Sequence, residues 1–146
     1  MSIIYLDTSA LLKLYVQEKF TDEVNALLAS ADAAGASILT YAEMAAAMKR
    51  AARTGLIVES EARAAWAAFD HDWPEYMRLK ISAPLTERAA SLAWEFGLRG
   101  YDAVHLAAAM TWQDALETPV TLATFDRLLW DAAHKSGMAT WPAARP

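Results

Sequence analysis

Apolar residues follow two kinds of spacing along this chain. Consecutive apolar runs, typical of strands buried on both faces, occupy residues 3–6, 36–39 and 119–124, and residues 138–141 form a weaker fourth run. Between these runs, apolar side chains recur every three or four residues, which predicts helices. Strands that alternate with helices predict an α/β sandwich with a central, mainly parallel sheet.

The predicted helices end at glycine or proline residues. Gly55, Gly97 and Gly137 each follow a helical pattern, and Pro74 ends another. Residues 80–82 are ambiguous. The helical patterns cover residues 11–16 and 24–28, and the segments 40–53, 59–73, 86–96, 101–116 and 125–137.

Composition narrows the class of protein. With 146 residues and 55% hydrophobic content, the chain fits one globular domain, residues 1–146. The net charge of -5 argues against a protein that coats nucleic acid by charge alone, and the absence of Cys excludes disulfides and thiolate metal sites. There is no signal-like N-terminus and no run of 18 uncharged apolar residues, so we expect a cytoplasmic protein without a membrane segment.

Four carboxylates stand at positions that a parallel sheet brings to one edge. Asp7 follows the first predicted strand, Glu43 lies within the first turn after the second, and Asp126 follows the third in the stretch LATFD. Asp102 begins the apolar helix after the Arg99-Gly100 turn. Because open α/β folds bind ligands at the carboxyl ends of their strands, we expect the four acids to converge there.

Each acid also has a structural interpretation. Thr40 and Glu43 fit a T-x-x-E capping box, and the three aspartates could each cap a helix. Carboxylates packed together without compensation, however, raise one another's pKa and destabilise the fold. A hard divalent cation relieves this, and a site without Cys or paired His favours Mg²⁺ or Mn²⁺ over Zn²⁺. Without these four acids the chain has 14 acidic and 13 basic residues, so most of its net charge belongs to the proposed site.

The motifs around these acids, taken in order, resemble PIN-domain ribonucleases, and more narrowly the VapC-type toxins of bacterial toxin-antitoxin pairs. They are LDTSALLK, the helix after the second strand, GYDAVHLAAA and ATFD, and they span almost the whole chain. The resemblance implies a PIN-like, Rossmann-like fold that holds one or two Mg²⁺ or Mn²⁺ ions. The residues it implies are the metal ligands Asp7, Glu43, Asp102 and Asp126, with Ser9 and Thr124 as supporting hydroxyl residues.

The resemblance further implies an endoribonuclease in which metal-activated water cleaves RNA to leave 5′-phosphate and 3′-hydroxyl ends. We expect Asp7 and Asp102 to be direct ligands, whereas Glu43 and Asp126 could coordinate the metal or position water. A homodimer is implied, as is a cognate antitoxin that wraps the toxin and blocks the metal site. Transfer, ribosomal and messenger RNA all remain open as substrates.

Basic residues on the helix of Glu43 could guide the substrate. Arg50 lies two turns beyond Glu43 on nearly the same face, and with Lys49 and Arg53 it would form a basic track for RNA phosphates. The alternative is an ordinary solvated helix surface. Lesser candidates beside the acids are Arg99 and Arg127.

For two further features, a structural role is the preferred interpretation. His105 follows Asp102 by three residues, and a lone His in an apolar helix is more often a hydrogen-bonded core residue than a ligand, so we leave it out of the metal set. Trp66, Phe69 and Trp73 form an aromatic stripe that predicts core packing. Docking of a second copy or of an antitoxin helix on this stripe is the alternative.

Other classes of protein also place Asp at strand ends around Mg²⁺. A haloacid-dehalogenase-type phosphatase needs a second acid two residues after the first, where this chain has Ser9. A receiver domain needs paired acids before its phosphorylated Asp and a Lys after a late strand, which here ends in residues 124–126, Thr-Phe-Asp. A catalytically silent PIN-like module that binds RNA or protein would be expected to have lost acids, and none of the four is lost.

Overall fold

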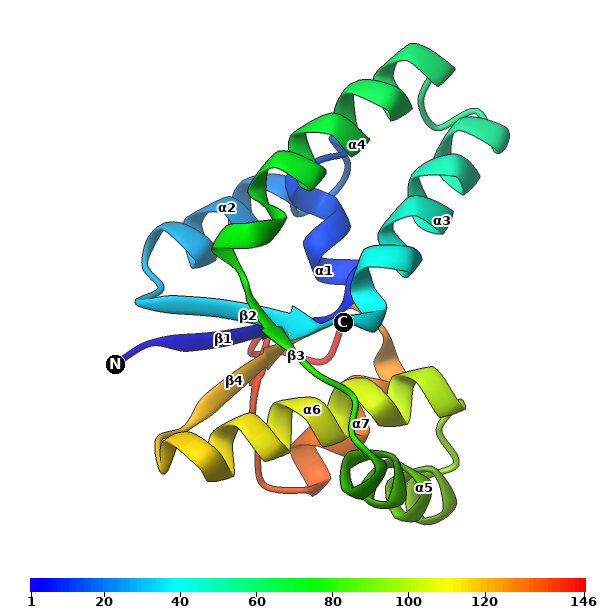
Figure 1. Ribbon diagram of the computed structural model, residues 1–146. Coiled ribbons are helices and arrows are strands. Elements are labelled where there is room, and N and C mark those ends of the chain that lie inside the picture. Colours follow the sequence, from blue (N-terminus) through cyan, green and yellow to red (C-terminus); the bar gives the residue numbers. More distant parts are fainter.

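A five-stranded sheet forms the centre of the protein, with helices on both of its faces (Figure 1). The computed structural model describes residues 1–146. All neighbouring strands are parallel and follow the order β3-β2-β1-β4-β5, which confirms the predicted α/β sandwich. The strands are β1 (Ile3–Leu6), β2 (Ala33–Ser37), β3 (Met77–Leu79), β4 (Val120–Ala123) and β5 (Ala139–Trp141).

The helices divide between the two faces according to the direction in which the chain crosses the sheet. From β1 the chain moves outward to β3, then returns across the centre to β4 and β5. Since crossovers between parallel strands are right-handed, this reversal puts the later helices on the opposite face (Figure 1). The first face carries α1 (Thr8–Leu11), α2 (Thr21–Ala29), α3 (Leu39–Arg53) and α4 (Glu59–Asp72), with 3₁₀ turns at Leu12–Leu14 and Trp73–Glu75; the second carries α5 (Ala83–Phe96), α6 (Gly100–Leu116) and α7 (Arg127–Lys135).

Strand β1 separates two hydrophobic cores. Ile3 and Tyr5 belong to the core under α5, α6 and α7, while Ile4 and Leu6 belong to the core under α1 to α4. All four side chains are buried, because a central parallel strand is covered on both faces. This double burial explains the uninterrupted apolar run that begins the chain.

Two strands differ from the sequence prediction. We expected the second strand at residues 36–39, but β2 covers Ala33–Ser37 and Ile38 is an exposed residue that precedes α3. Small alanines at the start of β2 do not stand out as an apolar run. The ambiguous residues 80–82 lie in a connection, and β3 comes just before them as a short edge strand whose sequence, MRL, mixes polar and apolar residues.

Helices α3 and α4 project from the sheet as an antiparallel pair (Figure 1). The predicted core packing of the aromatic stripe is confirmed for Phe69 and Trp73, which are buried there. Trp66 is half-buried and, with Met48 and Ala62, lines a hollow of about 460 Å³ between the two helices. None of the helices has the length and apolar character needed to cross a membrane.

Candidate active site

The site lies where the strand order reverses, between β1 and β4. Open α/β sheets form a ligand-binding crevice at this point, beyond the carboxyl ends of the strands. Leu6 pairs with Ala123, so Asp7 and Thr124 lie side by side directly after their strands. A cavity of about 620 Å³ opens there. All four predicted acids line it: Asp7, Glu43, Asp102 and Asp126.

Asp7 caps α1 and also faces the cavity. Its Oδ1 accepts hydrogen bonds from Ser9 Oγ at 2.7 Å and from the Ala10 N–H at 3.1 Å, and its Oδ2 accepts one from Thr124 Oγ1 at 2.8 Å. The side chain is only 4% exposed. Burial raises the pKa of Asp7, although the charge of His105 and these hydrogen bonds lower it. An ionised Asp7 is therefore well oriented but lacks a full counter-charge.

Ser9 and Thr124, the two predicted supporting residues, join the ends of β1 and β4. Ser9 Oγ accepts a hydrogen bond from the Phe125 N–H at 2.9 Å, and Thr124 Oγ1 accepts one from the Asp126 N–H at 3.0 Å. Each hydroxyl donates its own proton to Asp7. These two residues therefore fix the loop after β4 against Asp7.

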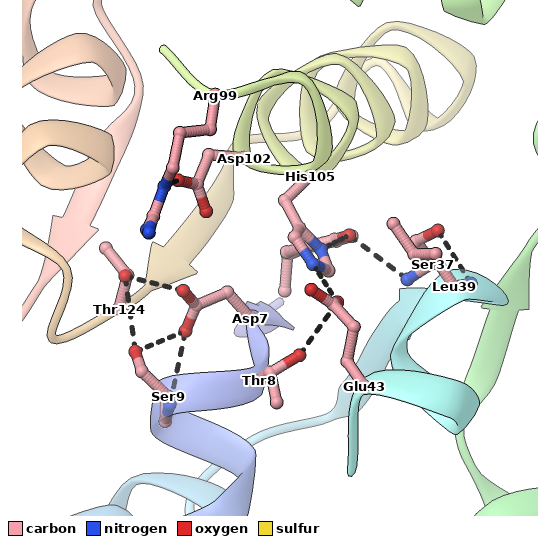
Figure 2. Close-up of polar contacts among 12 residues, drawn as sticks. Asp7, Thr8, Ser9, Ser37, Leu39, Glu43, Arg99, Asp102, His105 and Thr124 are labelled. Carbon is pink, nitrogen blue, oxygen red and sulfur yellow. Dashed lines mark hydrogen bonds and ion pairs between the residues drawn. The ribbon is translucent and has the colours of Figure 1, made fainter. Parts of the chain in front are cut away.

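Glu43 reaches the cavity from the second turn of α3. Its Oε1 accepts hydrogen bonds from Thr8 Oγ1 at 2.9 Å and from His105 Nε2 at 2.5 Å, whereas Oε2 has no partner (Figure 2). Burial raises the pKa of Glu43, but the hydrogen bond and charge of His105, together with the Thr8 hydrogen bond and the charge of Arg99, hold this pKa below its ordinary value. His105 is itself 1% exposed, which confirms a hydrogen-bonded core residue.

The predicted capping box is wrong. Helix α3 begins at Leu39, and the hydroxyl of Ser37 accepts a hydrogen bond from the Leu39 N–H at 3.1 Å. Thr40 lies inside the helix, with a buried hydroxyl that has no partner. With Ile38 as the N-cap residue, a capping acid would stand at residue 41; Glu43 is two residues too far along the helix, and its carboxylate lines the cavity instead.

Asp102 and Asp126 share one arginine. Arg99, which precedes the first residue of α6, donates from Nε to Asp102 Oδ2 at 2.9 Å and from Nη2 to Asp126 Oδ2 at 3.0 Å. Asp126 caps α7 as predicted, because its Oδ1 accepts from the Leu129 N–H at 2.9 Å, whereas Asp102 lies in the first turn of α6 and caps nothing. Burial raises the pKa of Asp102, the Arg99 hydrogen bond lowers it, and the charge of Asp126 raises it further.

The donor set of this cavity fits a hard divalent cation. Every predicted ligand is a carboxylate, and oxygen ligands are those that Mg²⁺ and Mn²⁺ prefer. Glu43 Oε2 and Asp102 Oδ1 have no protein partner, while burial disfavours the charged forms of Asp7 and Asp102. As the side chains stand, no three acidic or histidine residues are arranged to hold a metal ion, and Arg99 satisfies two of the four acids.

Comparison with known proteins places the chain in a family. Residues 4–135 match the PIN domain. This chain belongs to the PIN-domain family. It is 36% identical over 143 residues to Ribonuclease VapC45 and to Ribonuclease VapC49 from two strains of Mycobacterium tuberculosis, covering 98% of this chain and 97% of each relative, which confirms the VapC-type resemblance. A solved toxin-antitoxin complex from Klebsiella pneumoniae has the same fold, with a TM-score of 0.57 at 20% identity, covering 84% of this chain and 86% of that one.

The basic residues of this PIN domain differ in their relation to the cavity. Arg50 lines it together with Glu43. Lys49 instead pairs with Glu59 of α4 at 3.1 Å, outside the cavity, and Arg53 is an exposed residue at the end of α3. The structure therefore brings one of the three predicted track residues to the cavity wall. Of the lesser candidates, Arg99 lies at the acids and Arg127 donates to the carbonyl of Pro146.

Two residues of the PIN-domain site were missed in the sequence. Thr8 follows Asp7 and donates to Glu43, and nothing in its position sets it apart from an ordinary helix residue. Tyr5 stands among aliphatic residues in a buried strand and contacts His105. A buried tyrosine hydroxyl needs a hydrogen-bond partner, so Tyr5 carried a usable signal of a polar group beneath the site.

Proposed function

We propose that this PIN domain is a Mg²⁺- or Mn²⁺-dependent endoribonuclease, the toxin of a type II toxin-antitoxin pair. It would cleave RNA by attack of water on phosphorus, leaving 5′-phosphate and 3′-hydroxyl ends. The family makes the chain a nuclease, a hydrolase of phosphodiester bonds. One observation supports the proposal most directly: carboxylates from four separate elements line one cavity at the switch point of the sheet.

The four acids and Arg50 would have different roles in this site. Asp7 and Asp102, whose charged forms burial disfavours, are the proposed direct ligands. Glu43 would present Oε2 to the cation or to its water, and Asp126 would close the opposite side from the start of α7. When bound, the cation lowers the pKa of a water and stabilises charge at phosphorus. Arg50, which lies on the cavity wall, would contact the phosphate that reacts.

An antitoxin is the proposed protein partner, and a homodimer the proposed assembly. The solved Klebsiella neighbour is a toxin-antitoxin complex, which supports the first. Residues of α1, α3 and α6 line the cavity, so a partner segment laid across these helices would block it. We propose the cytoplasm as the place of action, where the RNA substrate and the antitoxin would be present together.

Cleavage of total cellular RNA by the purified, antitoxin-free protein tests this function. We expect cuts with Mg²⁺ or Mn²⁺ that carry 5′-phosphates and disappear in EDTA. Asp7→Asn and Asp102→Asn each remove a ligand charge and should lower the rate by about 100-fold or more. Asp114→Asn is the matched control, because Asp114 pairs with Arg88 on the surface, away from the cavity.

Three outcomes would contradict the proposal. Full activity in both ligand variants would overturn the site, and cutting that persists in EDTA would overturn the metal. Ends with a cyclic phosphate would show that the ribose 2′-hydroxyl attacks, not water. Failure of the folded, metal-loaded protein to cut any RNA would favour the silent binding module.

A further inference from the structure

A chain of hydrogen bonds runs from the sheet to Glu43. The Ser37 N–H donates to the hydroxyl of Tyr5 at 3.1 Å, this hydroxyl lies 2.7 Å from His105 Nδ1, and His105 Nε2 lies 2.5 Å from Glu43 Oε1 (Figure 2). The four residues come from β2, β1, α6 and α3. Ser37 and Tyr5 are fully buried and His105 is 1% exposed, so the chain is shielded from water up to the carboxylate.

The partners determine which nitrogen of His105 carries a proton toward Glu43. Because the Tyr5 oxygen already accepts the Ser37 N–H, the single Tyr5 proton is free to go to Nδ1 of a neutral ring. The ring proton is then on Nε2 and is donated to Glu43. A charged ring also donates from Nε2. The opposite tautomer would leave the Tyr5 proton without an acceptor and would aim the lone pair of Nε2 at the carboxylate oxygen of Glu43.

This donation leaves the two oxygens of Glu43 with different tasks. Oε1 is occupied by Thr8 and His105, and Oε2 is left without a protein partner in a residue that lines the cavity. A free Glu side chain loses several rotamers when it binds a cation, whereas this one is already ordered by its two donors.

We propose that Tyr5 and His105 are positioning residues of the metal site: together they hold Glu43 Oε1 so that Oε2 faces the cation or its water. This inference rests on the proposed function, because it assigns these residues a role in the same site. Groups that orient metal ligands from behind typically change metal affinity by about 10- to 100-fold when they are removed. The competing explanation is that the hydrogen bonds only stabilise the core, in which case metal affinity would not depend on them.

Mn²⁺ binding by isothermal titration calorimetry separates the two explanations. Tyr5→Phe keeps the ring and removes the hydroxyl, and His105→Leu fills the buried position with an apolar side chain and removes the donor. Both variants should bind Mn²⁺ more weakly, with a dissociation constant raised by about tenfold or more. His105→Gln places an amide N–H near the position of Nε2 and should bind within about threefold of wild type, since it restores the donor to Glu43. Tyr41→Phe is the matched control, because it removes an exposed hydroxyl that bonds Asp70 on the surface.

The same titrations distinguish failure of this inference from failure of the proposed function. Equal Mn²⁺ affinity in wild type, Tyr5→Phe and His105→Leu would overturn the positioning role but would not contradict the proposed metal site. Absence of Mn²⁺ binding in wild type would overturn the metal site and this role with it. Circular dichroism identifies any variant that fails to fold. The Mn²⁺ affinities of the folded variants then decide between the positioning role and a purely structural one.

Nitrogen-15 NMR of the imidazole rings tests the donor direction without metal. The chain has three histidines, so His105 can be assigned by comparison with His105→Gln. We expect its Nε2 to be protonated in wild type. An unprotonated Nε2 would overturn the inference whatever the affinity measurements show.

Discussion

Arg99 places a fixed positive charge among four carboxylates. Its guanidinium bonds one oxygen each of Asp102 and Asp126 and lies 4.8 Å from the ring centre of Tyr101. A divalent cation that uses the same oxygens must displace these bonds and overcome the repulsion of the guanidinium. The side chain is 59% exposed, so it is free to move outward when this happens.

Removing this charge should tighten metal binding. We expect Arg99→Gln to lower the Mn²⁺ dissociation constant by about two- to tenfold, because it removes the two ion pairs that the exposed Arg99 guanidinium makes with the acids. The control is Arg88→Gln, since Arg88 forms a surface ion pair with Asp114 at 2.7 Å outside the cavity. Weaker binding by Arg99→Gln would show instead that Arg99 holds the acids in place for the metal.

Asp7 should give the metal-free protein a particular dependence on pH. Burial raises its pKa in the folded state above the ordinary value of 3.8, so the folded protein retains the proton longer than the unfolded chain does. Stability from this group is therefore present below the ordinary pKa and is lost as the pH rises toward the raised one. In EDTA, the wild type should therefore lose stability relative to Asp7→Asn as the pH rises from the ordinary pKa to the raised one. The difference in free energy of unfolding should grow by about 1.4 kcal/mol for each unit by which the pKa is raised.

Denaturant unfolding of both proteins from pH 4 to pH 8 measures this difference. Subtracting one curve from the other cancels the titration of the remaining acids. Saturating Mn²⁺ should abolish the pH-dependent difference or reverse its sign, because the cation then favours the charged form of Asp7. A difference that shrinks with rising pH in EDTA would contradict the raised pKa.

At the scale of single residues, the sequence predicted the acids better than their partners. Asp7 and Asp126 follow apolar runs directly, and that signal is local. The pairing of Arg99 with Asp126 joins the start of α6 to the start of α7, 27 residues apart, and depends on how the two helices pack. The contact between Tyr5 and His105 spans 100 residues and passes through the core. No local pattern fixes contacts of this kind.

At the scale of elements, Gly35 shows how closely the sheet packs against α6. A Cβ at this position would lie 2.8 Å from the carbonyl oxygen of Met77 on β3 and 2.9 Å from the ring of Trp112 on α6. We expect Gly35→Ala to cost about 1–3 kcal/mol of unfolding free energy, because neither neighbour can move without disturbing its own element. Gly100→Ala is the control, with no atom within 4 Å of its Cβ and helical backbone that Ala favours. Equal stability of both variants in urea would contradict this close packing.

The same packing explains which elements the sequence could predict. Long helices with a regular apolar spacing, such as α4 and α6, were predicted to within a residue or so at either end. Strand β2 was misplaced because Ala33, Ala34 and Gly35 are small, a property that the contact with Trp112 requires at Gly35. Strand β3 lies at the sheet edge and carries a mixed pattern, so its membership of the sheet is decided by pairing with β2.

At the scale of the whole molecule, negative charge is concentrated where a polyanion has to bind. The net charge is -5, and five acidic residues, the four predicted acids and Glu18, line the cavity that would receive an RNA phosphate. Binding without metal should therefore depend on the few basic groups at the cavity wall. Among the three track residues, Arg50 faces the cavity and Lys49 is paired with Glu59.

Reversing these two charges should have unequal effects on RNA binding. In an Asp102→Asn background, with EDTA present to suppress cleavage, we expect Arg50→Glu to weaken binding of a single-stranded RNA by about tenfold at low salt. It should also reduce the slope of log K against log salt by about 0.7, the value for one lost phosphate contact on a single strand. Lys49→Glu makes the same change of charge on the same helix and should alter neither quantity by as much, since Lys49 points toward α4. Equal losses in the two variants, measured by fluorescence anisotropy across a salt series, would show that RNA responds to the net charge of the protein and not to a contact at the cavity wall.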